Sequence, residues 1–333
     1  MMERTFLTQL LAFDSTTGSE KNAREFLIQN FTSLGASVLE QKVTETQFNL
    51  YFYWGNPEIV FCAHQDTVPP YYVADSDEHT VYGRGACDAK GQIAVIYALV
   101  QELCSLGESN FGVLLTVREE SDSKGAQKAN ELPNSSRYLI VCEPTQNLMI
   151  SATKGTALFS LKTLGNAAHS GYPEAGKDAV ARFCAFREEL KQYHFPQDQE
   201  LGEVTYNFGH LRADNAANVI ADEVKAELFF RTTFAAEETV LRLRDLFAKD
   251  DLLLELVKST HPYRFATLEG FKTGVAAFTT DAPWLTAWGK PFLLGPGSIL
   301  DAHTMHEQLL WDDFCCGQKL LKQLYFKLKI HTL

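Results

Sequence analysis

Several histidines and acidic residues of this chain stand directly after short apolar runs. Imidazole and carboxylate groups are the ligands that zinc, cobalt and manganese take in proteins. Repeated placement after apolar runs therefore points to one metal site built at the ends of several strands. The residues are His64 and Asp66 after Ile59–Ala63, Glu119 and Glu120 after Leu114–Val117, Glu143 after Leu139–Cys142, and His303 after Phe292–Leu294 and the turn Gly295–Gly297.

Asp88 completes this group. It follows the glycine turn Gly83–Gly85, which lets the backbone come close to the metal site, and it stands just before a helical segment. So many carboxylates in one place repel one another unless cations lie between them, so we expect two divalent ions with Asp88 as the bridge. Asp66 stands two residues beyond His64, where its carboxylate would fix the tautomer of that ring.

The adjacent pair Glu119 and Glu120 offers two different roles. On an extended backbone neighbouring side chains point in opposite directions, so one glutamate would bind metal and the other would act as general base in amide hydrolysis. A lone His at a strand end is usually only polar surface, and an isolated Glu pair is common on solvated helices. The coincidence of five segments favours the metal site over these readings.

The elements that carry these residues alternate between strand and helix. Apolar runs at 58–63, 111–117, 138–142 and 291–294 are typical of buried strands, and segments 21–34, 91–106 and 309–329 of helices, as is an amphipathic start at 1–15. This order predicts an α/β fold with a mainly parallel sheet covered by helices on both faces. The carboxyl ends of parallel strands share one edge, where ligands bind in open α/β sheets.

The middle of the chain has a different rhythm. Strand patterns at 157–164, 203–211, 223–232 and 252–257 are interrupted by helical patterns at 178–192 and 237–248, the order βαββαβ of a ferredoxin-like sandwich. We therefore expect an inserted α+β domain at 155–262, within a catalytic domain made of 1–154 and 263–333.

Composition limits the partners. The net charge of −12 argues against a nucleic-acid partner, which needs clustered Lys and Arg. No apolar run approaches the length of a membrane span, and no basic leader with a cleavage site follows the start. Seven cysteines without a CxxC pair suit a reducing compartment, so we expect a cytoplasmic protein.

The chain resembles the zinc-dependent exopeptidases and deacylases that include acetylornithine deacetylase, succinyl-diaminopimelate desuccinylase, aminoacylase and glutamate carboxypeptidase. The resemblance covers most of the chain in the family's order. The matching segments are Ala63–Pro69, Gly83–Gly91, Glu119–Glu120, Glu143–Thr145, Ala168–Ser170, Gly295–Gly297 and Ala302–Glu307.

The resemblance implies a role for each matching residue. One metal would be held by His64, Asp88 and Glu143 and the other by Asp88, Glu120 and His303. Zinc is the expected metal, with cobalt and manganese as alternatives. Glu119 would be the general base and Asp66 the orienting carboxylate. His169 would reach the active site of the partner in a homodimer formed by the inserted domain, which would also serve as a lid. The implied substrate contacts are Asn218, Arg231, Thr280 and Asp281.

The sequence departs from the family pattern at Arg118, where Asp is usual, at Cys87 and Ala89 beside Asp88, and at His306, where an acidic residue is commoner. None of these changes removes a ligand, which argues against a non-catalytic binding protein. The expected activity is deacylation of an N-acyl amino acid, with N-acetylornithine in arginine biosynthesis first. N-succinyl-diaminopimelate, N-acetylcitrulline, N-acetyllysine and the dipeptidase or carboxypeptidase reaction remain open.

Overall fold

The computed structural model describes residues 2–247 and 249–330, and the chain divides into two compact units. The first unit comprises Met1–Ser151, Phe265–Gly274 and Thr280–Leu333, and the second Ala152–Arg264 and Val275–Thr279. The predicted boundaries at 154/155 and 262/263 lie close to these limits. The short return of the chain into the second unit after residue 274 is not expected from the sequence. The predicted helix ends Met1 and Ala248 lie outside the described residues.

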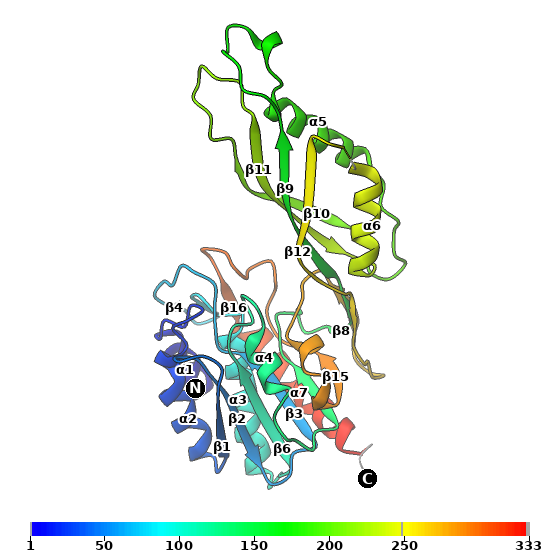
Figure 1. Cartoon of the computed structure of the whole chain (residues 1–333). Coiled ribbons are helices and arrows are strands. Elements are labelled where there is room, and N and C mark those ends of the chain that lie inside the picture. The colour runs from blue at the N-terminus through cyan, green and yellow to red at the C-terminus, as the bar shows by residue number, and fades with distance from the viewer. Residues whose placement is uncertain (1, 248, 331–333) are drawn as a thin grey trace. The chain divides into compact units, whose positions relative to one another are not determined.

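The first unit is a mixed α/β structure around a six-stranded sheet (Figure 1). The strand order is β1-β2-β6-β3-β7-β15, in which β6, β3, β7 and β15 run parallel and β1 and β2 are antiparallel additions at one edge. The strands are β1 (Ser37–Lys42), β2 (Phe48–Trp54), β3 (Ile59–His64), β6 (Phe111–Thr116), β7 (Tyr138–Val141) and β15 (Lys290–Leu293).

Both faces of this sheet are covered. Alternate residues of β3, Ile59, Phe61 and Ala63, join the main apolar core, while Val60 and Cys62 between them are buried on the other face. The helices that supply the main core are α1 (Met2–Leu11), α2 (Lys21–Ser33), α3 (Lys90–Ser105) and α7 (Trp311–Ile330). The short helix α4 (Lys124–Ala129) packs against β2 and β6. The near-continuous apolar runs of the central strands follow from this double burial.

Two further sheets have three strands each. One has the order β16-β5-β4 and the other β13-β8-β14. Their strands are β4 (Asp75–Ser76), β5 (Thr80–Tyr82), β8 (Met149–Thr153), β13 (Tyr263–Arg264), β14 (Thr273–Ala276) and β16 (Gln308–Leu310). None of the described helices combines the length and the apolar character that crossing a bilayer requires.

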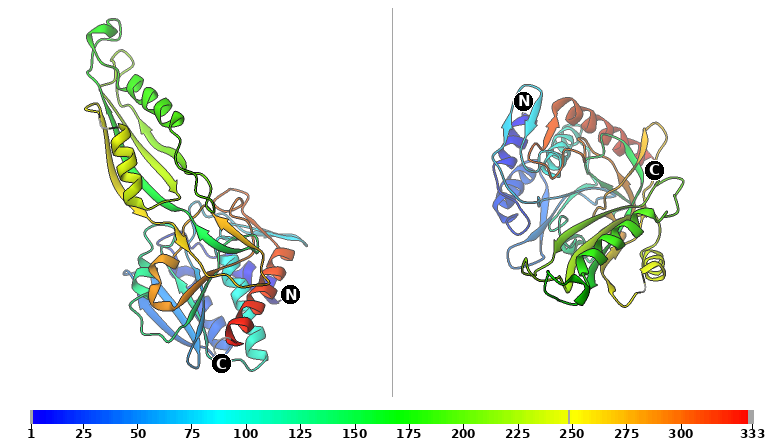
Figure 2. Two further views of the ribbon diagram at one scale, coloured as in Figure 1. Left: turned by 90° about the vertical axis from the view of Figure 1, so that its right-hand side faces the viewer. Right: turned by 90° about the horizontal axis from the view of Figure 1, so that it is seen from above.

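The second unit has the element order βαββαβ. Its four-stranded antiparallel sheet has the order β10-β11-β9-β12, and one apolar core joins the sheet to both helices, so α5 and α6 cover the same face (Figure 2). The elements are β9 (Gly155–Leu164), α5 (Ala179–Gln192), β10 (Thr205–Arg212), β11 (Glu223–Thr232), α6 (Ala236–Phe247) and β12 (Leu252–Thr260). β11 alternates as predicted, with Val224, Ala226, Leu228 and Phe230 buried.

Candidate metal centre

His64 lies at the carboxyl end of β3 with its ring buried. Nε2 is 2.9 Å from Oδ1 of Asp88 and 3.7 Å from Oε2 of Glu143. On the other side of the ring, Nδ1 is 2.8 Å from the backbone carbonyl oxygen of Asp66. A carbonyl can only accept a hydrogen bond, so the proton of a neutral ring belongs on Nδ1 and Nε2 is left to bind a metal.

The carboxylate of Asp66 does a different task from the predicted one. Its Oδ1 is 3.7 Å from Nδ1 of His64, which is beyond hydrogen-bond distance, so the backbone oxygen and not the side chain sets the tautomer. The buried carboxylate instead accepts the N–H groups of Glu119 at 3.0 Å and Glu120 at 3.1 Å, and the hydroxyl of Thr17 at 2.9 Å. Asp66 therefore fixes the backbone of the glutamate pair.

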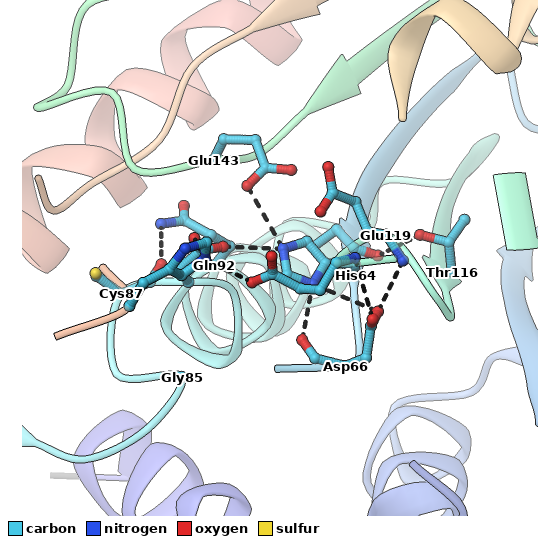
Figure 3. Close-up of polar contacts among 12 residues, drawn as sticks. His64, Asp66, Gly85, Cys87, Gln92, Thr116, Glu119 and Glu143 are labelled. Carbon is cyan, nitrogen blue, oxygen red and sulfur yellow. Dashed lines mark hydrogen bonds and ion pairs between the residues drawn. The ribbon is translucent and has the colours of Figure 1, made fainter. Parts of the chain in front are cut away.

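Glu119 and Glu120 lie in a turn after β6, so the prediction of an extended backbone at this pair is wrong. The two side chains still face different neighbours. Oε1 of Glu120 is 2.9 Å from Nε2 of His303. The carboxylate of Glu119 instead interacts electrostatically with His64 and Glu143, which both influence its pKa. In Figure 3 the carboxylates of Glu119 and Glu143 appear on one side of the His64 ring and that of Asp66 on the other.

Asp88 lies between two sets of possible ligands. Its Oδ1 faces His64, and its Oδ2 is 3.3 Å from Nε2 of His303. The ligand atoms of His64, Asp88 and Glu143 all lie within 4.8 Å of one another, and so do those of Asp88, Glu120 and His303. These are the two sets that the resemblance implies. A third such set, His64 with Glu119 and Glu120, overlaps both.

The pKa values of these groups are shifted because several carboxylates and two imidazoles are enclosed together. Burial raises the pKa of Glu143 to about 7 and raises that of Glu119 well above its usual value, and neighbouring carboxylates add to both shifts. Hydrogen bonds to Asp88 and then Glu120 raise the pKa of His303 to about 10. Hydrogen bonds to the two imidazoles lower the pKa of Asp88 despite its burial. Two imidazoles and three carboxylates gathered in this way are a donor set that fits divalent metal ions.

Gln92 supports the centre and has no predicted role. Its Nε2 donates to the carbonyl oxygens of Cys87 and Pro296, both at 2.8 Å, and so joins the loop before Asp88 to the turn that leads to His303. The sequence signal that would have found it is a polar side chain at the start of an otherwise apolar helix.

Thr280 and Asp281, predicted as substrate contacts, are both buried, with exposures of 3% and 2%. Burial also raises the pKa of Asp281 to about 6, and neither of its carboxylate oxygens has a hydrogen-bond partner of good geometry among the described residues. A direct contact with a substrate would therefore require the surrounding side chains to move.

The other predicted contacts belong to the second unit. The exposed residues His169 and Asn218 are neighbours, because the N–H of Ser170 donates to the Asn218 carbonyl at 2.9 Å. Arg231 is at the other end of the sheet: it pairs with Thr156 near the start of β9, whereas His169 lies beyond the end of that strand. Eight strand residues correspond to about 26 Å, so these residues of one subunit cannot contact the same small molecule together.

Comparisons with known proteins show to which family the chain belongs. Residues 60–327 match the model of peptidase family M20/M25/M40. A peptidase M20 domain-containing protein of Schizosaccharomyces pombe is 32% identical over 329 residues, which cover 95% of this chain and 82% of that protein. The chain belongs to peptidase family M20/M25/M40. It is thus a hydrolase of a metallopeptidase family, whose metallopeptidases use divalent metal ions, typically zinc.

Two further proteins are similar to this chain over more than nine tenths of its length. A probable carboxypeptidase of Aspergillus clavatus is 31% identical over 350 residues, covering 93% of this chain and 84% of that one. The crystal structure of a tripeptidase from Staphylococcus aureus shares the fold with a TM-score of 0.79 at 19% identity, and the match covers 96% of both chains.

Proposed function

We propose that the protein is a two-metal hydrolase that cuts the amide bond next to the free α-carboxylate of a short peptide. The observation that carries this proposal is the pair of ligand sets joined by Asp88, with the Glu119 carboxylate beside them and outside both. Divalent ions in these sets, zinc in the first place, would supply Lewis-acid chemistry that polarises a carbonyl and makes water a better nucleophile.

The protein's own residues then perform the proton transfers. Glu119 takes a proton from the attacking water and returns it to the leaving nitrogen, since its enclosed carboxylate has the raised pKa that suits a group alternating between base and acid. The carboxylate of Asp66 accepts the backbone N–H of Glu119 and so holds the backbone of this glutamate in place. The proposed base is therefore positioned before the reaction begins.

Substrate binding is shared between two copies in this proposal. Arg231 pairs with the substrate α-carboxylate through its planar guanidinium group. His169 and Asn218 lie too far from Arg231 within one unit to reach the same molecule, so they act in the site of the partner subunit. Dimerisation through the second unit is supported by its edge strand β12, which exposes Leu253, Leu256 and Val257.

The choice of a peptide substrate rests on the relatives. The Aspergillus clavatus relative, which is 31% identical in sequence, is named a probable carboxypeptidase. The Staphylococcus aureus protein that shares the fold is a tripeptidase. N-acetylornithine deacetylation is the second candidate, favoured by the segments Thr280–Leu285, Leu294–Ile299 and Ala302–His303, which look closest to acetylornithine deacetylase. N-succinyl-diaminopimelate, N-acetylcitrulline and N-acetyllysine follow it.

A substrate panel tests the proposal. The zinc-loaded protein would be given dipeptides and tripeptides, the same peptides with an amidated C-terminus, and the four N-acyl amino acids. We expect the highest kcat/KM for a peptide with a free carboxylate, at least about tenfold above the best N-acyl amino acid, which is about 1.4 kcal/mol in the transition state. Equal cleavage of amidated peptides would remove the role of the carboxylate. A tenfold preference for N-acetylornithine would establish the second candidate instead.

A further inference from the structure

Glu307 is a buried carboxylate that has no role in the chemistry described so far. It is fully enclosed, and so is its ion-pair partner Arg84, whose Nη1 is 2.6 Å from Oε2 of Glu307. Buried ion pairs are not a general source of stability, because desolvation costs about as much as the attraction returns. The position of this pair in the fold therefore calls for another explanation.

The second oxygen of Glu307 holds the loop that ends in Asp88. Oε1 accepts three backbone N–H groups, from Gly85 at 3.0 Å, Cys87 at 3.2 Å and Asp88 at 3.1 Å. Gly85 has a φ of 89°, and a Cβ at this position would lie 2.9 Å from a side-chain carbon of Thr67. The loop is thus wrapped closely around one acceptor oxygen.

Glu307 also ends the loop that carries His303, four residues earlier. The hydroxyl of Tyr72 lies 3.2 Å from the backbone nitrogen of Glu307, which donates to it, and 3.3 Å from the carbonyl oxygen of Thr304, to which it donates. The guanidinium of Arg84 lies over the Tyr72 ring, 5.3 Å from its centre. The buried pair of Glu307 and Arg84, together with the half-buried Tyr72, therefore joins the backbones of the two loops.

We propose that Glu307, supported by Arg84, is a positioning residue that sets the place of Asp88 relative to His303 and thereby the affinity of the metal set formed by Asp88, Glu120 and His303. This inference rests on the proposed two-metal function. The contacts act on backbone atoms, so Glu307 touches neither metal nor substrate.

Glu307→Gln is the sharpest test, because it keeps the shape and removes the charge. A glutamine amide has one acceptor oxygen and one donor nitrogen, so either Arg84 or the three N–H groups must face another donor. We expect zinc titration of the metal-free protein, with a competing chelator, to show about a 10- to 100-fold weaker second site, the range typical of outer partners of metal ligands. The first site, with His64 and Glu143, should change less.

Glu108→Gln is the matched control. Glu108 accepts the Tyr325 hydroxyl at 3.0 Å and pairs with Lys329, and it precedes β6 at the end opposite the glutamate pair. The Glu108→Gln substitution should lower the melting temperature of the metal-free protein without changing the affinity of either zinc site. Wild-type affinity for both ions in Glu307→Gln would overturn the inference and leave the function standing. A wild-type protein that binds no metal would overturn the function itself.

A milder variant covers the case in which Glu307→Gln does not fold. Tyr72→Phe removes only the hydroxyl that links Glu307 and Thr304. The second zinc site should weaken between about two- and tenfold, as expected for the loss of one hydrogen-bonding group. An unchanged second site in a folded Tyr72→Phe protein would contradict the proposed link between the loops.

Discussion

At the scale of single residues, the centre separates groups that hold a metal from groups that hold other residues. The possible ligand atoms of His64, Asp88 and Glu120 lie close together. The carboxylate of Asp66 instead accepts two backbone N–H groups. Because Asp66 binds the backbone of both glutamates, a single buried side chain decides where the proposed base and a proposed ligand are placed.

Glu119→Gln should separate chemistry from metal binding. Loss of a general base typically reduces turnover by about two to four orders of magnitude. Glu119 is outside the two sets joined by Asp88, so the variant should keep its metal ions and its KM. Metal analysis and steady-state kinetics measure both quantities. Glu120→Gln is the matched control and should lose metal, since Glu120 faces His303 at 2.9 Å. If the two variants exchange behaviour, the roles within the pair are reversed.

The residue types at the centre can be read from the sequence, but their hydrogen-bond partners cannot. The placement of His64, Glu143 and His303 after apolar runs predicts a shared edge, because residue type and the apolar run before it are local signals and the carboxyl ends of parallel strands lie at one edge. The tautomer of His64 depends on a backbone oxygen, and the glutamate pair lies in a turn in which Arg118 has a φ of 67°. Neither feature leaves a mark in residue type.

At the scale of elements, the parallel strands β3, β6, β7 and β15 bring His64, the glutamate pair, Glu143 and the turn before His303 to one edge, and the loop before α3 adds Asp88. The alternation of apolar strands and helices predicts these four strands and the helices that cover them. It does not reveal β1, because β1 is largely exposed and lacks a buried run, and pairing at a sheet edge is decided by tertiary contacts. The prediction also omits β2, although this strand is mostly buried and rich in aromatic residues. The βαββαβ order of the second unit is visible in the sequence chiefly because its two central strands, β9 and β11, alternate between buried and less buried residues.

The turn Gly295–Gly297 is an element whose shape the centre requires. A Cβ on Gly295 would lie 2.2 Å from Oε1 of Gln92 and 2.5 Å from the backbone oxygen of Glu143. Gly295→Ala should therefore push Glu143 away, lower the free energy of unfolding by about 1–3 kcal/mol, and weaken metal binding.

Denaturant unfolding and zinc titration check this prediction. Gly209→Ala is the control, because a Cβ there meets only the Glu227 side chain, at 3.9 Å or more. It should change stability by no more than about 0.5 kcal/mol. A Gly295→Ala protein with wild-type zinc affinity would show that the turn does not position Glu143.

At the scale of the whole molecule, the two units carry different parts of the proposed site. The metal ligands all belong to the first unit, and His169, Asn218 and Arg231 to the second. The separation of His169 from Arg231 within the second unit is a physical argument for the proposed sharing of the site between two subunits, and sequence spacing alone does not provide it.

Mixing two inactive variants tests the shared site. His169→Ala and Glu119→Gln each damage a different part, so a mixed dimer contains one site with both residues intact. With full exchange, half of the dimers are mixed, and about a quarter of the wild-type activity should return. Subunit exchange is followed separately, for example with differently tagged chains. Proven exchange with no recovery of activity would place His169 outside the partner's site.

The central claim is that the residues joined by Asp88 hold the metal ions on which hydrolysis depends. The most direct measurement is peptide hydrolysis by protein stripped with a chelator and then titrated with zinc, with bound metal counted at each step. We expect activity to be lost on stripping and to return as two ions per chain are bound, whereas His303→Ala should not recover activity. Full activity of the metal-free protein would contradict this claim.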